Sequence, residues 1–217
     1  MCPTEYNKSW SNVEKGYLPT LGDRLNPSIH IMWTGDRVIA EITHEGQEWI
    51  NPLIKRPAYV WWNFPVSDYV RDHLLLGPVY GNDTHIKDDL SGFVANPMER
   101  AEASKIAIYS VADYAWNMEK FDSQRSWNNA IKDLMPTSHK ALKVFASHNS
   151  DLGPNGHGFR RKESVEMKPI ADRIMNSLQT GDVSSSDLQL LKQTYQDILT
   201  SANLLLGSSD NTTLIKE

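Results

Sequence analysis

The stretch from Pro57 to Asp68 constrains the fold of this chain more than any other part of the sequence. After Pro57, β-branched and aromatic residues run together, and this composition predicts a short buried strand. The apolar run breaks at Asn63, and a carboxylate follows at Asp68. An apolar wall beside an amide and a carboxylate suits a flat ring that carries hydroxyl groups. We therefore expect the rim of a sugar site at this end of the strand.

Three other short runs predict strands, at residues 1–6, Ser28–Gly35 and Ser91–Ala95, and a short helix is expected within Glu41–Ile54. The connections are too long for hairpins, which indicates parallel strands in βα units. Four such strands make half of a TIM-like (β/α)8 barrel, where the chemistry lies at the carboxyl ends of the strands. Those ends carry hydrogen-bonding residues, which we expect to meet at one site: Tyr6, Thr34, Asn63 with Asp68, and Asn96.

Capping signals predict two further helices in this α/β part. One starts near Asp68, with Ser67 as its N-cap and Gly77 as its stop. The other opens at Asn96-Pro97-Met98-Glu99, with Asn96 as the N-cap, and runs to about Trp116. Its apolar face is expected to hold Ile106, Tyr109, Ala112 and Trp116. The polar segment Asn7–Asn26 is predicted to be a loop.

Beyond about Asp122 only helical signals remain. They cover Gln124–Leu134, Ser138–Ala146 and, after a Gly/Asn/His loop at His148–Gly158, two more helices. In the last one, from about Asp187 to Leu206, six residues repeat at helical spacing as a core or interdomain stripe, and Gly207 can end it. The six are Leu188, Leu191, Tyr195, Ile198, Ala202 and Leu205. We predict a partial barrel over residues 1–140 and an all-α helical domain over residues 141–217.

Charge and composition exclude several classes of partner. The net charge is −5 with no Lys/Arg stripe, which argues against nucleic acid and anionic membranes. No apolar stretch approaches the roughly 20 residues of a transmembrane helix. The single cysteine, Cys2, excludes an internal disulfide and a multi-cysteine zinc site. The spacing of His148, Asp151 and His157 fits no zinc or calcium pattern, so we expect neither a metal nor a cofactor.

Several motifs follow one another in the order of a known family. They are CPTEYNKSW at Cys2–Trp10, IMWTG at Ile31–Gly35, YVWWNFPVSD at Tyr59–Asp68, GPVYG at Gly77–Gly81 and VANPM at Val94–Met98. The chain resembles glycoside hydrolase family 84, the β-N-acetylglucosaminidases or O-GlcNAcases, and its bacterial members most closely. The resemblance spans almost the entire chain. It implies a TIM-like catalytic barrel followed by a helical domain, and removal of terminal β-linked N-acetylglucosamine with retention.

The resemblance also implies a mechanism in which the acetamido oxygen of the sugar attacks the anomeric carbon, an exception to the usual two-carboxylate scheme. Two adjacent aspartates assist it, one orienting the acetamido group and one acting as general acid and base. In the family this pair ends the fourth barrel strand, whereas this chain begins at what resembles strand five. Its one Asp-Asp pair, Asp88-Asp89, precedes a strand and lies near the wrong end of the barrel. We therefore expect no hydrolysis by this chain alone.

The resemblance assigns further roles to single residues. Asp68 would bind the sugar hydroxyls O4 and O6, and Asn63 would contact the polar network near the catalytic carboxylates. Asn96 would point from a helix cap to the substrate. Tyr6 would stabilise the oxazoline-like intermediate. The acetamido pocket would be lined by Cys2, Thr34 and Trp61, with Trp10 at its mouth; without the resemblance, Trp61 and Cys2 would be read as core.

Other interpretations remain open at this stage. The chain could be a non-catalytic sugar-binding module, or a fragment that complements a separately encoded N-terminal half of the barrel. A hyaluronidase-type glycosidase would differ only in its substrate. The N-terminal residues lack the features of a signal peptide and read as strand, so we expect the chain to begin inside a domain. The family implies a secreted or periplasmic parent, and open sheet edges imply aggregation or dimerisation of the isolated chain.

Overall fold

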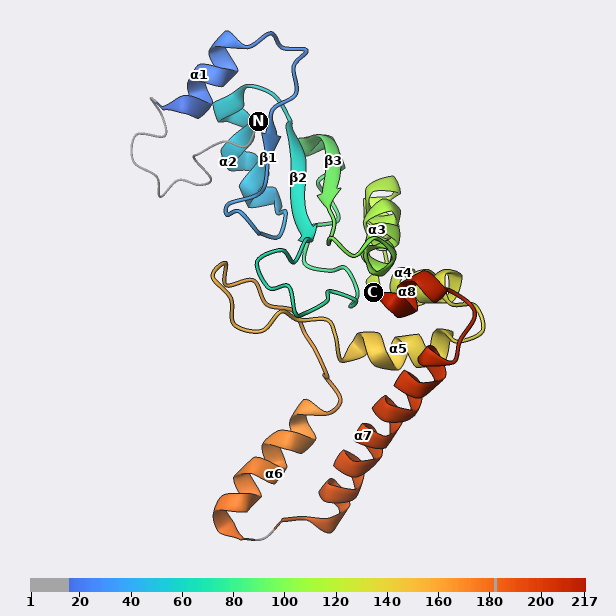
Figure 1. Ribbon diagram of the computed structural model, residues 1–217. Coiled ribbons are helices and arrows are strands. Elements are labelled where there is room, and N and C mark those ends of the chain that lie inside the picture. Colours follow the sequence, from blue (N-terminus) through green and yellow to red (C-terminus); the bar gives the residue numbers. More distant parts are fainter. Residues whose placement is uncertain (1–15, 182) are drawn as a thin grey trace.

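The computed structural model describes residues 16–181 and 183–217, and its N-terminal part is built on one parallel sheet (Figure 1). The strands are β1 (Met32–Trp33), β2 (Ala58–Pro65) and β3 (Leu90–Asn96), in the order β1-β2-β3. Helix α1 (Tyr17–Arg24) packs on α2 (His44–Ile54), which connects β1 to β2. A short 3-10 turn, η2 (Lys87–Asp89), leads into β3.

The two faces of β2 differ in burial, as its alternating side chains require. Val60, Trp62 and Phe64 point to one face and are almost fully buried in the main core. Tyr59, Trp61 and Asn63 point to the other, where the Trp61 side chain is 41% exposed. One face of the sheet is thus covered and the other is open.

The remaining regular elements of the described chain are helices. They are α3 (Ala101–Trp116), the 3-10 turn η3 (Met118–Lys120), α4 (Ser123–Leu134), α5 (His139–Ser147), α6 (Lys168–Thr180), α7 (Ser185–Leu206) and α8 (Thr212–Lys216). Helix α3 packs on α4, and α5 packs on α7. In Figure 1, α6 and α7 project away from the sheet, and α8 returns towards α3.

This architecture confirms the predicted fold class, the C-terminal half of a TIM-like barrel followed by an all-α region. Three of the four predicted strands are present and parallel. The fourth, at residues 1–6, lies outside the described residues. The predicted helices within Glu41–Ile54, Gln124–Leu134 and Ser138–Ala146 are also present. Among the described residues, no helix combines the length and apolar character that a membrane span needs.

The helix predicted from Asp68 to Gly77 is wrong. The segment forms turns instead, in which the Val70 N–H donates to the Ser67 carbonyl. Further along, the Leu75 N–H donates to Met98 Sδ and the Leu76 N–H to the Asn149 carbonyl. These bonds leave no helix here, because the N–H groups of both buried leucines are committed to distant parts of the chain.

The predicted start of α3 is also wrong. Asn96 is the last residue of β3, where its carbonyl accepts from the Val66 N–H, and the helix begins at Ala101. The Glu217 carboxylate caps the first turn by accepting from the N–H groups of Glu102 and Ala103. The predicted apolar face is rotated: Trp116 is 91% exposed. The buried side chains are instead Ala103, Ser104, Ile106, Ala107, Ser110, Val111 and Tyr114.

Two local differences remain in the N-terminal part. The predicted loop Asn7–Asn26 contains α1, whose Leu18 is fully buried against the α2 side of the sheet. The run Ser28–Gly35 forms a strand only at Met32 and Trp33. The β1 strand is short because the chain turns at once: Gly35 adopts a positive φ of 100°, a backbone conformation that favours glycine.

Candidate functional site

The carboxyl ends of β2 and β3 carry a connected group of polar side chains. Asn63 Oδ1 accepts hydrogen bonds from Trp61 Nε1 at 2.9 Å and from Asn96 Nδ2 at 3.0 Å. The Asn63 Nδ2 amide donates to the Val38 carbonyl at 2.6 Å. We call these residues, Trp61, Asn63, Asn96 and the Val38 carbonyl, the Asn63 cluster. It joins both strand ends to the loop after β1.

Two residue types explain why this cluster forms. An amide side chain offers both an acceptor and a donor, so Asn63 can bridge two donors and one carbonyl at once. Trp61 presents its indole N–H on the open face of the sheet, two residues before Asn63, because side chains alternate along a strand. Half-buried amides beside a 41% exposed indole give the site polar groups next to an apolar wall. This is the composition of a site for a hydroxylated ring.

Thr34 lies in the loop that supplies Val38. Its side chain is buried, and its Oγ1 donates to the Arg37 carbonyl at 2.9 Å. That bond shapes the turn after β1 and thereby helps to place the Val38 carbonyl. Thr34 is thus connected to the Asn63 cluster through this loop. Its hydroxyl group already donates its proton to a carbonyl of the same loop.

Asp68 follows β2 and has an exposed side chain. In the described part of the chain, no hydrogen bond or ion pair reaches its carboxylate; only its backbone carbonyl accepts, from Arg71 Nε at 3.3 Å. The next residue, Tyr69, has a buried hydroxyl without a hydrogen-bond partner in the described structure. Burial raises the pKa of Tyr69 to about 12, and the Asp68 charge adds to the shift. Asp68 is therefore a free acceptor beside the strand ends.

The remaining predicted site residues, Cys2, Tyr6 and Trp10, lie outside the described residues. Of the site predicted from the sequence, the structure joins Trp61, Asn63 and Asn96 directly and Thr34 through one loop. The pair Asp88-Asp89 lies at the start of β3, at the opposite end of that strand from Asn96. Asp89 there accepts from the His44 ring at 3.0 Å, which ties it to α2.

Two groups near the Asn63 cluster, the Tyr59 ring and the Val38 carbonyl, were not predicted from the sequence. Tyr59 lies on the open face, where its ring meets the His30 ring edge-on at 5.7 Å, and His30 Nδ1 lies 3.0 Å from Ser91 Oγ. The period of two residues from Asn63 and Trp61 back to Tyr59 would have found it. The Val38 carbonyl leaves no signal in the sequence, because every residue carries the same backbone group.

His148, Asp151 and His157, whose spacing fits no zinc or calcium pattern, each contact other side chains of the protein. His148 Nδ1 lies 2.7 Å from Ser164 Oγ, and the His157 ring packs edge-on against Tyr69. Asp151 accepts from Arg160 Nε and the Arg161 N–H, both at 2.7 Å. Burial alone would raise the pKa of Asp151, but these bonds hold it below its usual range. The loop is thus held by these contacts.

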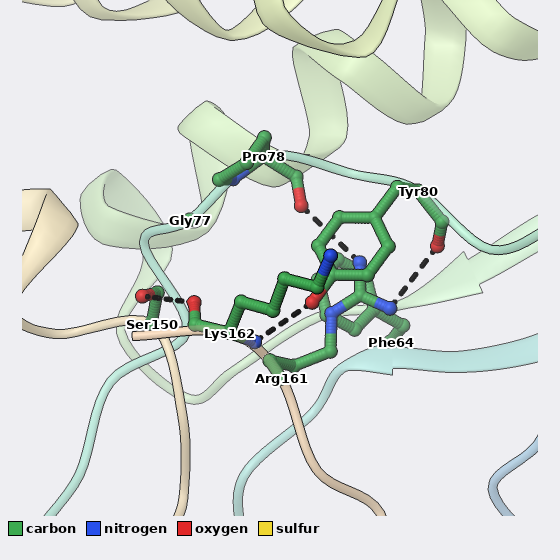
Figure 2. A pocket seen from close by; sticks show the side chains of 7 residues that line it. All are labelled: Phe64, Gly77, Pro78, Tyr80, Ser150, Arg161 and Lys162. Carbon is green, nitrogen blue, oxygen red and sulfur yellow. Dashed lines mark hydrogen bonds between the residues drawn. The ribbon is translucent and has the colours of Figure 1, made fainter. Parts of the chain in front are cut away.

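A small pocket is lined by Phe64, Arg161 and the loop at Gly77–Tyr80 (Figure 2). The Nη1 atom of Arg161 donates to the Tyr80 carbonyl at 3.0 Å, and its Nη2 atom donates to the Pro78 carbonyl at 3.2 Å. The guanidinium carbon stacks 3.6 Å from the Tyr80 ring centroid and 5.1 Å from that of Phe64. The space left over is too small for a water molecule. This cavity is a clamp between segments rather than a ligand site.

Known proteins share the sequence and the fold of this chain. Residues 1–147 match the family model described as "beta-N-acetylglucosaminidase". The chain belongs to this family. Residues 163–217 match a second model, described as the post-catalytic domain of bacterial GH84 proteins. The family that the sequence resembles, and the fold class of half a barrel followed by helices, are thus confirmed.

Solved structures of the family extend the likeness to the whole chain. The structure of CpGH84D is 34% identical with a TM-score of 0.89, and the match covers 99% of this chain and 36% of that one. A mutant of the O-GlcNAc hydrolase of Thermobaculum terrenum is 27% identical with a TM-score of 0.80, covering 96% of this chain and 44% of that one. The mouse protein O-GlcNAcase is 38% identical over 148 residues, which are 66% of this chain and 15% of the mouse protein.

Proposed function

We propose that this chain forms part of a glycoside hydrolase that removes terminal O-linked N-acetylglucosamine by a retaining, substrate-assisted mechanism. The observation that carries the proposal is the Asn63 cluster, a polar group at the carboxyl ends of neighbouring parallel strands in a β-N-acetylglucosaminidase family chain. That edge is where TIM-type barrels hold their active sites. Relatives named O-GlcNAcase and O-GlcNAc hydrolase support the same substrate.

In this proposal the chain supplies the sugar-binding half of the site. Asp68, free on the rim, accepts hydrogen bonds from O4 and O6, and the Asn63 cluster faces the reacting end of the sugar. Trp61 and Thr34 line the acetamido pocket together with Cys2, while Trp10 lies at its mouth. Tyr6 stabilises the oxazoline-like intermediate.

The proposal also assigns the acid and base to a part outside this chain. The only adjacent aspartates in the sequence, Asp88-Asp89, lie at the far end of β3, one of them bonded to His44. Without a general acid and a polarising carboxylate, catalysis loses on the order of 10² to 10⁴-fold for the proton transfer alone. The chain by itself therefore binds the sugar but does not hydrolyse it. Residues 1–140 are proposed as the partial barrel and residues 141–217 as the helical domain.

The test uses an aryl β-N-acetylglucosaminide. The 217-residue chain is assayed alone and then joined to the N-terminal barrel half of a family relative. We expect turnover only in the joined protein. Binding of N-acetylglucosamine without restored turnover would favour a pure sugar-binding module. Turnover by the chain alone would mean that the catalytic groups are misassigned.

Asp68 gives the sharpest single-residue prediction. Asp68→Asn in the joined protein removes a charged acceptor of two hydrogen bonds, each worth about 1.5–3 kcal/mol, so kcat/KM falls by about 10²-fold or more. Asp72→Asn, an exposed carboxylate in the following turns, is the matched control and leaves kcat/KM unchanged within about twofold. Equal effects of both substitutions would remove Asp68 from the proposed site.

A further inference from the structure

A cleft of about 1040 Å³ lies between α4, α5, the start of α6 and the first half of α7. Its lining shares no residue with the Asn63 cluster, so it is a separate feature of the molecule. One wall is formed by Lys140 and Lys143 on α5 and by Lys162 in the loop that precedes α6. We call it the lysine cleft.

The three lysines of this cleft are exposed, and none has a carboxylate partner in the described part of the chain. Elsewhere Lys55, Lys87, Lys105 and Lys168 each pair with an aspartate or glutamate. Glu166 is the one carboxylate among the lining residues. The cleft is therefore a positive region on a chain whose net charge is −5. Such a region attracts anionic groups and orients them.

Another part of the lining is aliphatic. Val165 is 60% exposed and Leu190 on α7 is 50% exposed, and Met167 and Ile170 lie beside them. Exposed apolar side chains that share a cleft mark an interaction site. A ligand that satisfies both parts of the lining carries carboxylates together with aliphatic groups.

The aromatic residues of the cleft already contact cationic side chains of the protein. The Trp127 side chain is buried, its Nε1 donates to the Leu76 carbonyl, and Lys143 Nζ lies 5.6 Å from its ring centroid. The Tyr80 ring stacks on Arg161. Glycans and single-stranded nucleic acids depend on open aromatic faces, and the cleft offers aliphatic ones instead.

We propose that the lysine cleft binds an acidic polypeptide segment. Its carboxylates pair with Lys140, Lys143 and Lys162, and its aliphatic side chains pack on Val165 and Leu190. Lys140 and Lys143 are three residues apart on α5, so both ammonium groups lie on one helix face and can meet neighbouring carboxylates. The site is independent of the proposed sugar site.

The experiment measures the fluorescence anisotropy of a labelled peptide of alternating Glu and Leu mixed with the full 217-residue chain. We expect saturable binding that weakens as salt is added, because exposed ion pairs are screened. The double variant Lys140→Glu with Lys143→Glu weakens binding at least about tenfold, since two attractive pairs become repulsive. The charge-matched control, Lys120→Glu with Lys132→Glu, changes two exposed lysines outside the cleft and leaves binding within about twofold.

The aliphatic part of the lining is tested separately. Leu190→Asn weakens binding by about threefold or more, while Leu204→Asn, a 60% exposed leucine of the same helix outside the lining, does not. Circular dichroism checks that each variant folds. Equal binding by cleft and control variants, or equal binding of a Gln-Leu peptide, overturns the proposal. Self-association of the chain that the cleft variants abolish overturns it as well.

Discussion

Asn63 shows how one side chain can organise a site. Its amide connects the ends of two strands with the loop after β1, through bonds of 2.6 to 3.0 Å. The sequence predicted a polar role for this residue because the apolar run of β2 breaks there. It could not predict the partners, since the Val38 carbonyl lies 25 residues earlier in the chain and the Asn96 amide 33 residues later.

The indole N–H of Trp61 reports on this cluster. In Asn63→Leu the indole loses its acceptor, so its ¹H–¹⁵N resonance moves, and the free energy of unfolding falls by about 1–3 kcal/mol because two donors and one carbonyl lose their partner. Asn63→Asp keeps the acceptor and leaves the indole resonance nearly in place. Asn128→Leu, on the exposed side of α4, is the control. An unmoved resonance in Asn63→Leu would contradict the hydrogen bond.

His44 gives a prediction about pH. The hydrogen bond to Asp89, with the Glu48 charge nearby, raises the pKa of His44 above its ordinary value. A pKa that is higher in the folded state adds stability below the unfolded-state pKa and loses it as the pH rises through the folded one. The difference in urea midpoint between the native chain and His44→Gln should therefore be present near about pH 5 and vanish by about pH 8. A constant difference across this range would show that the charge on His44 does not matter.

Among the helices and strands, the sequence predicted those whose formation depends on interactions between residues close together in the chain. The strand predicted from the aromatic-rich run of β2 and the helices predicted from the periodicity of α4 and α5 are present in the structure. The errors arise where distant partners take over. The α3 cap comes from Glu217, more than 100 residues away, and the backbone of Leu75 and Leu76 is held by Met98 and Asn149. In α7, the predicted stripe residues Leu188 and Tyr195 are 47% and 58% exposed, while Leu205 is buried.

The pairing of β2 with β3 depends on a glycine. Gly92 lies opposite Tyr59, and a Cβ added there would stand 2.2 Å from Tyr59 Cε2. The Tyr59 ring would have to turn away from the added methyl group and lose its edge-on contact with His30, so Gly92→Ala should reduce the free energy of unfolding by about 1–3 kcal/mol in urea denaturation. Gly156→Ala is the matched control, because nothing lies within 4 Å of its added Cβ. Similar effects of both substitutions would mean that the strands are spaced more widely than the structure has them.

At the scale of the whole molecule, Arg161 connects the helical part to the half-barrel. It lies in the segment between α5 and α6, yet its side chain is only 2% exposed and reaches the carbonyls of Pro78 and Tyr80. Burial lowers the pKa of Arg161. No pattern in the sequence indicates this role, because an arginine in a polar loop is usually solvated. Phe64, which its guanidinium approaches, is the residue next to Asn63, so the clamp lies directly behind the proposed sugar site.

Truncation of this clamp should destabilise both parts together. Arg161→Met keeps the aliphatic stem but leaves the Pro78 and Tyr80 carbonyls without their donors, at about 1–3 kcal/mol for each buried group. Glu41, 3.7 Å from Nη1, adds little because its side chain is 48% exposed and can be hydrated. We expect the free energy of unfolding in urea denaturation to fall by about 2–4 kcal/mol, with a single transition for both parts.

Arg24→Ala, at the exposed end of α1, is the control and should change the free energy of unfolding by less than about 0.5 kcal/mol. If Arg161→Met lowered the free energy of unfolding no more than Arg24→Ala does, the clamp would not hold the helical part to the half-barrel.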